Sequence, residues 1–288
     1  MANAVRVLTD STAYLPQEIL DRHALTSVPL QVVVDGRSYD EGDLGGTDVA
    51  EALRRRRSVT TSRPSPARLL AAYERLARQG ATEIVSVHLS AAVSGTYEAA
   101  GMAARDAPVP VHVVDSRALG MALGYLAVSA AELAERGLDG AQVADAVRRL
   151  SGGVRVYFYV DTLEHLRRGG RITAAQALIG SALAVKPLLT LEDGRIVPLE
   201  KVRTATRALA RLEDLTVAAV GHGARVAVHH LDSAGRADAL VERLRARLGP
   251  GRELVCSEIG PVIGAHVGPG MVGAVVVPAT PDLSCTGG

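Results

Sequence analysis

The 288-residue sequence has no tryptophan, one phenylalanine and only two lysines, Lys186 and Lys201. Aromatic residues make up 3% of the chain. This scarcity argues against base-stacking platforms for nucleic acid and against an aromatic cage for carbohydrates or quaternary amines. The net charge of +1 gives no basic field that would favour a nucleic acid partner.

Cysteine is equally sparse. Cys256 and Cys285 lie far apart and form no CxxC pair, so neither a disulfide framework nor a thiolate metal site is predicted. The adjacent residues His229 and His230, near Asp232, point to opposite faces of a strand and cannot easily share a metal ion. We expect no metal and no cofactor.

Long apolar runs are missing as well. The longest, at about residues 118–131, is too short to cross a bilayer, and residues 5–8 form only a strand rather than a signal sequence. We expect a cytoplasmic protein with at most transient membrane contact. No heptad pattern is present, which favours a monomer.

Hydrophobic residues make up 48% of the chain, enough for a substantial core. Up to residue 150 strands alternate with helices, which predicts a mostly parallel sheet flanked by helices. After residue 150 a hairpin over 188–199 and three further strands predict a mixed or antiparallel sheet with helices. We therefore predict an α/β fold with two α/β domains, 1–150 and 151–288.

The central stretch 154–189 begins the second predicted domain. It begins as a strand, and Asp161 then caps a short amphipathic helix that Gly169 and Gly170 end. Arg168 and Arg171 bracket the glycines, either as a solvated helix end or as a docking corner for an anionic group or a partner. Residues 172–184 are apolar nearly all round and small, which predicts a buried helix that another group can approach closely.

Four polar segments remain. A hydroxyl-rich loop over 60–66 contains Thr61 and Ser62, and Ser94, Gly95 and Thr96 precede a helix predicted over 98–105. That helix start is either a plain N-cap or an anion site. Arg203, which we group with Arg171, follows the hairpin before a helix through residue 212, and a Gly-rich loop over 259–270 holds His266.

Together these segments supply hydroxyls, helix-end amides, guanidinium and imidazole, without a nucleophile–base pair or a metal triad. Such an inventory recognises a small anion. Because an unusually apolar helix accompanies it, a carboxylate attached to a long hydrocarbon fits both parts.

The sequence resembles the DegV family, the fatty-acid-binding proteins that include the FakB subunit of bacterial fatty acid kinase. The resemblance covers nearly the whole chain and rests on motifs at residues 9–12, 61–65, 94–97, 169–172, 186–187 and 264–270. It implies a long-chain fatty acid held between two α/β domains, with its carboxylate at Thr61 and Ser94 and with His266 close by. It also implies that a separate, FakA-like fatty acid kinase subunit phosphorylates the carboxylate, and that Arg171 helps that subunit to dock.

We therefore expect three groups of functional residues in a carrier that is not itself an enzyme. The carboxylate site comprises Thr61, Ser62, Ser94, Gly95, Thr96, Arg203 and His266. The acyl tunnel comprises Ile172, Ala177, Leu178, Ile179, Ala182 and Ile263, and partner docking uses Arg168 and Arg171. The sequence departs from the family at Arg63, where glutamine is common, and at Ala91, where a serine pair with Ser90 is common.

Two other functions stay open. A lipid sensor or transport protein would bind the same ligand without a kinase. An acyl hydrolase would use Ser94 and His266, although no acidic residue that orients His266 is evident.

Overall fold

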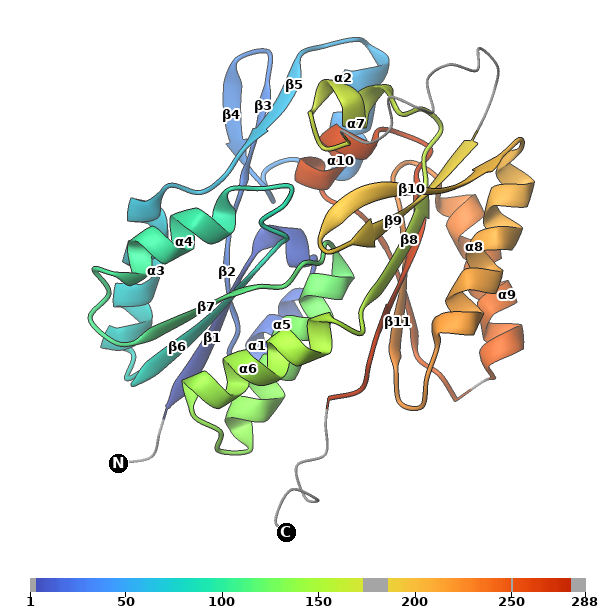
Figure 1. The fold of residues 1–288 in the computed structure, drawn as a ribbon. Coiled ribbons are helices and arrows are strands. Elements are labelled where there is room, and N and C mark those ends of the chain that lie inside the picture. The colour runs from blue at the N-terminus through green and yellow to red at the C-terminus, as the bar shows by residue number, and fades with distance from the viewer. Residues whose placement is uncertain (1–3, 173–185, 250, 281–288) are drawn as a thin grey trace.

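The computed structural model describes residues 4–172, 186–249 and 251–280, which form helices and three β-sheets (Figure 1). The first sheet has the strand order β2-β1-β6-β7, and all of its pairs are parallel. Its strands are β1 (Val5–Asp10), β2 (Thr26–Val28), β6 (Glu83–His88) and β7 (Val111–Asp115). Helices α3 (Pro66–Arg78) and α4 (Thr96–Ala104) cover one face, and α5 (Met121–Glu135) and α6 (Gly140–Ser151) cover the other. The predicted parallel sheet flanked by helices is confirmed.

The second sheet is mixed, with the order β10-β9-β8-β13-β11-β12. Only β11 and β12 pair in parallel there, and the other neighbours are antiparallel. Its strands are β8 (Arg155–Tyr159), β9 (Lys186–Glu192), β10 (Arg195–Val202), β11 (Arg225–His230), β12 (Leu254–Glu258) and β13 (Val272–Val277). Helices α8 (Ala205–Ala219) and α9 (Ala234–Leu248) cover its outer face. Because α5 contacts β13 and β11 as well as β1, it lies between the two large sheets. The mixed sheet and the α/β class are confirmed.

A small third sheet joins the two parts of the chain. It has the antiparallel order β4-β3-β5, with β3 (Gln31–Val34), β4 (Arg37–Asp40) and β5 (Val59–Ser62). Helix α2 (Gly46–Arg54) and helix α10 (Pro261–Val267) pack on it, so Val32 and Val49 share a core with Ala265. Short helices occur at α1 (Gln17–Arg22), α7 (Glu164–Arg168) and a 3₁₀ turn (Ser11–Ala13). Because this core combines early and late residues, a domain boundary after residue 150 stays a prediction.

Two predicted loops are regular elements instead. The hydroxyl-rich segment forms β5, whose residues Val59 to Ser62 pair with β3. Threonine fits a pleated strand well, and only the long-range partner decides whether that preference is used. The Gly-rich segment forms α10, which Pro261 starts at a first helical position where its missing N–H costs nothing.

Smaller differences concern helix ends. Helix α4 begins at Thr96, two residues earlier than predicted, and α8 continues past residue 212 to Ala219. Helix α7 begins at Glu164, and Asp161 does not cap it but pairs with Lys186 at 2.6 Å. The helix predicted over 172–184 lies outside the described residues apart from Ile172, which is buried. In the described part of the chain, no helix is both long and apolar enough to cross a membrane.

Candidate functional site

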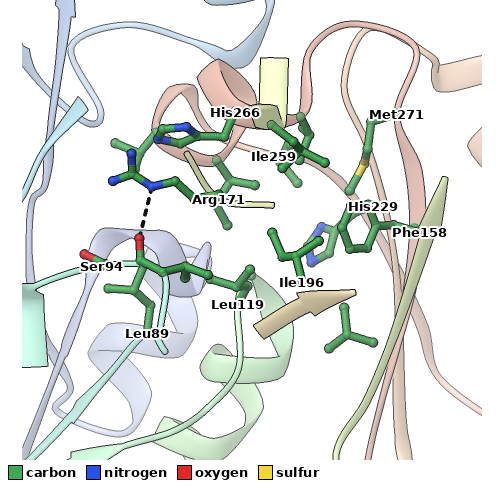
Figure 2. A pocket seen from close by; sticks show the side chains of 18 of the residues that line it. Leu89, Ser94, Leu119, Phe158, Arg171, Ile196, His229, Ile259, His266 and Met271 are labelled. Carbon is green, nitrogen blue, oxygen red and sulfur yellow. Dashed lines mark hydrogen bonds between the residues drawn. The ribbon is translucent and has the colours of Figure 1, made fainter. Parts of the chain in front are cut away.

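A cavity of about 290 Å³ lies between the two large sheets and beneath α10 (Figure 2). We call it the central cavity. Its polar end is lined by Thr61, Ser62, Arg63, Ser94, Gly95, Arg171 and His266. The rest is mostly apolar and comes from the segments before α4 and α5, from β8, β10 and β13, and from the segment 259–271. The cavity therefore combines one polar end with a long apolar interior.

Thr61 and His266 meet at the polar end. The Thr61 Oγ1 atom lies 2.8 Å from His266 Nε2, a hydrogen bond that joins β5 to α10. Burial and the neighbouring Arg171 charge lower the pKa of His266 to about 4, so the imidazole is neutral near pH 7. If Nε2 carries the hydrogen and donates it to Thr61, the Thr61 hydroxyl is free to donate into the cavity.

The imidazole ring of His266 fits against residue 169 because that residue is a glycine. A Cβ atom added at Gly169 would lie 2.3 Å from His266 Nδ1, which is closer than any real contact. The Nδ1 atom is buried and has no hydrogen-bond partner among the described residues. The glycine predicted as a helix end thus also makes room for the imidazole ring.

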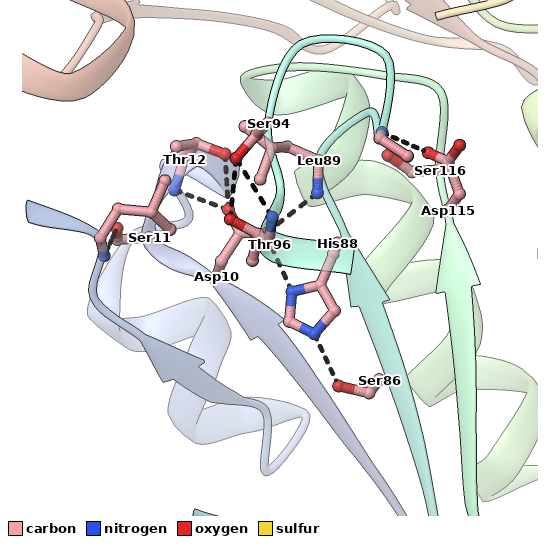
Figure 3. Close-up of polar contacts among 12 residues, drawn as sticks. Asp10, Ser11, Thr12, Ser86, His88, Leu89, Ser94, Thr96, Asp115 and Ser116 are labelled. Atoms are coloured by element: carbon pink, nitrogen blue, oxygen red, sulfur yellow. Dashed lines mark hydrogen bonds and ion pairs between the residues drawn. The ribbon is translucent and has the colours of Figure 1, made fainter. Parts of the chain in front are cut away.

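Thr96 fixes the position of Ser94 through hydrogen bonds. The Ser94 Oγ atom lies 2.9 Å from Thr96 Oγ1 and accepts a hydrogen bond from the Thr96 backbone N–H at 3.3 Å (Figure 3). Thr96 is fully buried and does not line the central cavity. We expected Thr96 to contact the carboxylate, whereas the structure makes it a support for Ser94. When Thr96 donates both bonds, the Ser94 hydroxyl can donate into the cavity.

The cations of the site differ in position. Arg171 lines the cavity, where its Nε donates to the Val93 carbonyl at 3.1 Å and its Nη1 donates to the Gly169 carbonyl. Arg171 is partly buried and does not form the exposed docking corner that we expected, and this burial lowers the pKa of its guanidinium. Arg168 remains exposed on α7 and pairs with Glu164 at 2.5 Å.

Two more residues predicted for the carboxylate site, Ser62 and Gly95, line the polar end of the central cavity, and Arg203 does not. Ser62 lines the cavity and hydrogen-bonds Gln31 at 3.3 Å, and the Arg63 guanidinium lies against Gly95. Arg203 is exposed between β10 and α8 and is not among the described residues that line the central cavity. The sequence suggests that Arg203 joins the other polar residues at one anion site, but after the hairpin of β9 and β10 Arg203 is exposed and lies outside the lining of the central cavity.

Sequence reasoning identified little of the apolar interior. Of the predicted tunnel residues, Ile263 lines the cavity, whereas Ile172 is buried in the core without lining it. Ala177, Leu178, Ile179 and Ala182 lie outside the described residues. The interior that Figure 2 shows is lined by side chains the sequence did not single out, among them Leu89, Leu119, Phe158, Ile196, Ile259 and Met271.

His229 is a polar group within this interior. Its Nε2 accepts the Met121 N–H at the start of α5 at 2.9 Å, so in the neutral ring Nδ1 carries the hydrogen and faces Ser257 Oγ at 3.2 Å. Burial lowers its pKa to about 4. A neutral imidazole with two hydrogen-bond partners satisfies the start of α5 without placing a charge in the apolar interior.

A buried polar chain lies behind Ser94 (Figure 3). Asp10 accepts hydrogen bonds from Thr12 Oγ1 at 2.6 Å and from the Leu89 N–H at 3.0 Å, and its Oδ2 lies 3.1 Å from His88 Nδ1. The His88 Nε2 atom lies 2.8 Å from Ser86 Oγ. The motif at residues 9–12 thus fixes the end of β6, from which the Ser94 segment departs.

These contacts disfavour a hydrolase. Within the described residues, Ser94 bonds Thr96 rather than His266, and no carboxylate orients the His266 ring. Ser86, His88 and Asp10 do form a Ser–His–Asp chain, but all three are fully buried and none lines the central cavity. The described residues also contain no group of three or more histidine, cysteine, aspartate or glutamate side chains that could hold a metal ion.

Comparison with known proteins places the chain in a family. The profile described as "Uncharacterised protein, DegV family" matches residues 4–279. The chain is 54% identical over 278 residues to a DegV domain-containing protein of Streptomyces coelicolor, an alignment that covers 96% of this chain and 99% of that protein. It is 38% identical over 277 residues to the protein DegV of Bacillus subtilis, covering 93% and 97% of the two chains.

Two solved structures are similar over nearly their whole length. One is described as showing fatty acid binding by a DegV family protein of Thermus thermophilus, with a TM-score of 0.88, 33% identity and 95% and 99% of the chains covered. The other is DegV of Bacillus subtilis, described as a fatty acid binding protein, with a TM-score of 0.88, 36% identity and 96% and 99% covered. This chain therefore belongs to the DegV family.

Proposed function

We propose that the central cavity binds one long-chain fatty acid, with the carboxylate at the polar end and the acyl chain in the apolar interior. The observation that carries this proposal is that a single cavity joins hydroxyl donors to an apolar interior. The printed descriptions of the Thermus and Bacillus relatives as fatty-acid-binding proteins support it.

The acyl chain supplies most of the binding energy. At ~0.8 kcal/mol per buried methylene, about 14 methylenes offer roughly 11 kcal/mol before the costs of association. A buried carboxylate without partners would lose several kcal/mol of this. The polar end therefore has to provide hydrogen bonds even though it adds little affinity by itself.

Thr61 and Ser94 are the donors that we assign to the carboxylate. Each has its oxygen held by a second group, His266 for Thr61 and Thr96 for Ser94, so that its own hydrogen can point into the cavity. Gly95 and Ser62 complete the rim, and Arg171 adds a positive charge from the side.

We further propose that a separate fatty acid kinase subunit phosphorylates the bound acid in the cytoplasm. A carboxylate oxygen attacks the γ-phosphorus of ATP, the bond from that phosphorus to the β-phosphate oxygen breaks, and the electron pair leaves with ADP. The kinase supplies the nucleotide, and the exposed Arg168 on α7 is our candidate contact for it. This division of work fits a site whose described residues provide hydrogen-bond donors but no nucleophile–base pair.

The second candidate is a lipid sensor or transport protein that feeds no kinase. The same cavity and the same donors serve it equally well. It differs in one respect, because it predicts tight binding without any acyl phosphate when the kinase subunit and MgATP are added.

The first experiment is mass spectrometry of the lipid extracted from natively purified protein, where we expect about one fatty acid per chain. The delipidated protein is then titrated with palmitate in competition with a fluorescent fatty acid. Thr61→Val keeps the shape but removes the donor and should weaken palmitate binding about tenfold. Thr60→Val is the matched control, because Thr60 is exposed on the same strand and does not line the central cavity.

Each arm has an outcome that contradicts part of the proposal. If no lipid co-purifies and palmitate does not bind, the fatty-acid site is wrong. If palmitate binds but hydroxylamine traps no acyl phosphate in the presence of MgATP and a fatty acid kinase subunit, the carrier role is wrong and the sensor role stands.

A further inference from the structure

Glu41 lies outside the central cavity but is bonded to the helix that lines it. Glu41 follows β4, and its Oε1 atom accepts hydrogen bonds from the Val262 backbone N–H at 3.0 Å and from the Tyr14 hydroxyl at 3.1 Å. Its Oε2 atom accepts a hydrogen bond from the Ser11 hydroxyl at 2.5 Å. All three donors are neutral groups, and they come from the segment after β1 and from the first turn of α10.

Two backbone N–H groups fix the direction of these bonds. The Leu30 N–H donates to Ser11 Oγ at 3.0 Å, and the Ile263 N–H donates to the Tyr14 hydroxyl oxygen at 3.3 Å. Since each hydroxyl oxygen already accepts a hydrogen, its own hydrogen is available for Glu41. Glu41 is therefore bonded to the first turn of α10 both directly and through Tyr14.

Helix α10 needs such an external partner. It has seven residues, and the residue that precedes it, Gly260, has no side chain with which to cap it. A Cβ atom added at Gly260 would lie 2.6 Å from Glu41 Oε1, so the carboxyl group lies directly against the start of the helix. Three residues of α10, Val262, Ile263 and His266, line the central cavity.

We propose that Glu41 is a positioning residue for the central cavity, because its carboxyl group sets the place of α10 and with it of Ile263 and His266. The ring of Tyr14 also meets His229 edge-on, with ring centroids 6.2 Å apart, and His229 lines the apolar interior (Figure 2). The inference rests on the fatty-acid function proposed above, although neither Glu41 nor Tyr14 lines the central cavity.

Ionisation of Glu41 gives this arrangement a pH dependence. Burial, reinforced by the Asp10 charge, outweighs the three hydrogen bonds and raises the pKa of Glu41 from 4.5 to about 7. The packed carboxyl group thus binds a proton more tightly than a solvated one does, so the proton stabilises the packed arrangement at pH 6, and this stabilisation is lost as the pH rises through 7. Protonated Glu41 can donate to Ser11 Oγ, which keeps a second lone pair for it.

The other titratable groups near Glu41 do not account for such a change. The pKa values of His229 and His266 are about 4, and burial raises the pKa of Tyr14 well above its usual value. None of these three groups changes its charge between pH 6 and pH 8. The segments around Glu41 also carry the carboxyl groups of Asp10, Asp40, Asp43 and Glu258, with Arg68 paired to Asp40.

The first test is hydrogen exchange of the α10 amides in delipidated protein at pH 6 and pH 8, with each rate divided by the intrinsic rate at that pH. In wild type we expect about tenfold more protection at pH 6, the effect of a carboxyl group with a pKa near 7 in the packed arrangement. In Glu41→Gln, which keeps a neutral donor toward Ser11, protection should agree at the two pH values within about twofold.

Asp43→Asn is the matched control, because Asp43 is an exposed carboxyl group on the same segment. It should keep the wild-type dependence, and the amides of α6 provide a reference within each protein. Equal pH dependence in wild type and Glu41→Gln, or none in wild type, would overturn the role of Glu41.

The second test is palmitate affinity in the competition assay at pH 7. Glu41→Ala and Tyr14→Phe each leave an N–H of α10 without its partner and should weaken palmitate binding about tenfold, whereas Glu41→Gln should restore it. The controls are Asp43→Ala and Tyr39→Phe. The Tyr39 hydroxyl has no hydrogen-bond partner in the described part of the chain, and Tyr39 does not line the central cavity.

The two tests separate this inference from the proposed function. If wild type binds palmitate and both Glu41→Ala and Tyr14→Phe bind it equally well, the positioning role is wrong while the fatty-acid site stands. If wild type binds no palmitate, the proposed function fails, and hydrogen exchange alone then decides whether Glu41 positions α10.

Discussion

The neutral state of His266 leads to a prediction about how the free energy of unfolding depends on pH. Burial and Arg171 lower the pKa of His266 from 6.5 to about 4. Between these values the folded protein binds fewer protons than the unfolded chain, so the free energy of unfolding falls as the pH falls. For this one group the loss between pH 7 and pH 5 is about 2 kcal/mol.

The variant His266→Gln removes the titrating group and keeps a polar side chain. We expect the loss of stability between pH 7 and pH 5 to be about 2 kcal/mol smaller in His266→Gln than in wild type. His229, with a pKa of about 4, and Glu41, whose pKa burial raises to about 7, also titrate in this window with opposite effects. Both are present in the two proteins, so their contributions cancel in the comparison.

The assay is urea unfolding of delipidated protein at pH 7 and pH 5. His222→Gln, which removes an exposed imidazole, controls for the loss of a histidine as such. An equal loss of stability in wild type and His266→Gln would refute the reasoning, because it would mean that His266 is not held neutral by burial.

Three further predictions concern residues that line the site or support it. Gly169→Ala, at a φ of −72° that suits alanine, should push His266 from Thr61 and weaken palmitate binding about tenfold in the same competition assay. Asp10→Ala should lower the free energy of unfolding by about 3–5 kcal/mol in urea, against a small effect of Asp21→Ala at an exposed position. Ile196→Phe narrows the apolar interior and should shift the lipids that co-purify toward shorter chains, as mass spectrometry would show.

The polar residues of the site were the predictable part. Thr61, Ser94 and His266 stood out because hydroxyls and a histidine occur in segments that the hydrophobic pattern leaves unexplained, and the structure brings all three to one cavity. Their secondary structure was harder to predict. Whether residues 59–62 form a loop or a strand is decided by pairing with β3, a contact that no local pattern records.

The apolar interior could not be predicted for a related reason. In β13 all six residues are buried, so no alternation marks which side chains face the cavity and which face α8. The sequence likewise could not show that the polar residues Thr96 and Arg203 do not line the cavity. Thr96 follows Ser94 by only two residues, yet it is buried and hydrogen-bonds Ser94 instead of lining the cavity. Arg203 follows the β9–β10 hairpin and is exposed.

The donors at the polar end fit our proposal that a bound carboxylate is phosphorylated there. A guanidinium bound in a bidentate pair would hold a carboxylate tightly and would also withdraw charge from the oxygens that must attack phosphorus. In this site Arg171 directs two of its N–H groups at the Val93 and Gly169 carbonyls, and burial keeps His266 neutral. Hydroxyls then satisfy the carboxylate with weaker, neutral hydrogen bonds. For the kinase reaction that we propose, such a site offsets the cost of burying the carboxylate while leaving it a nucleophile.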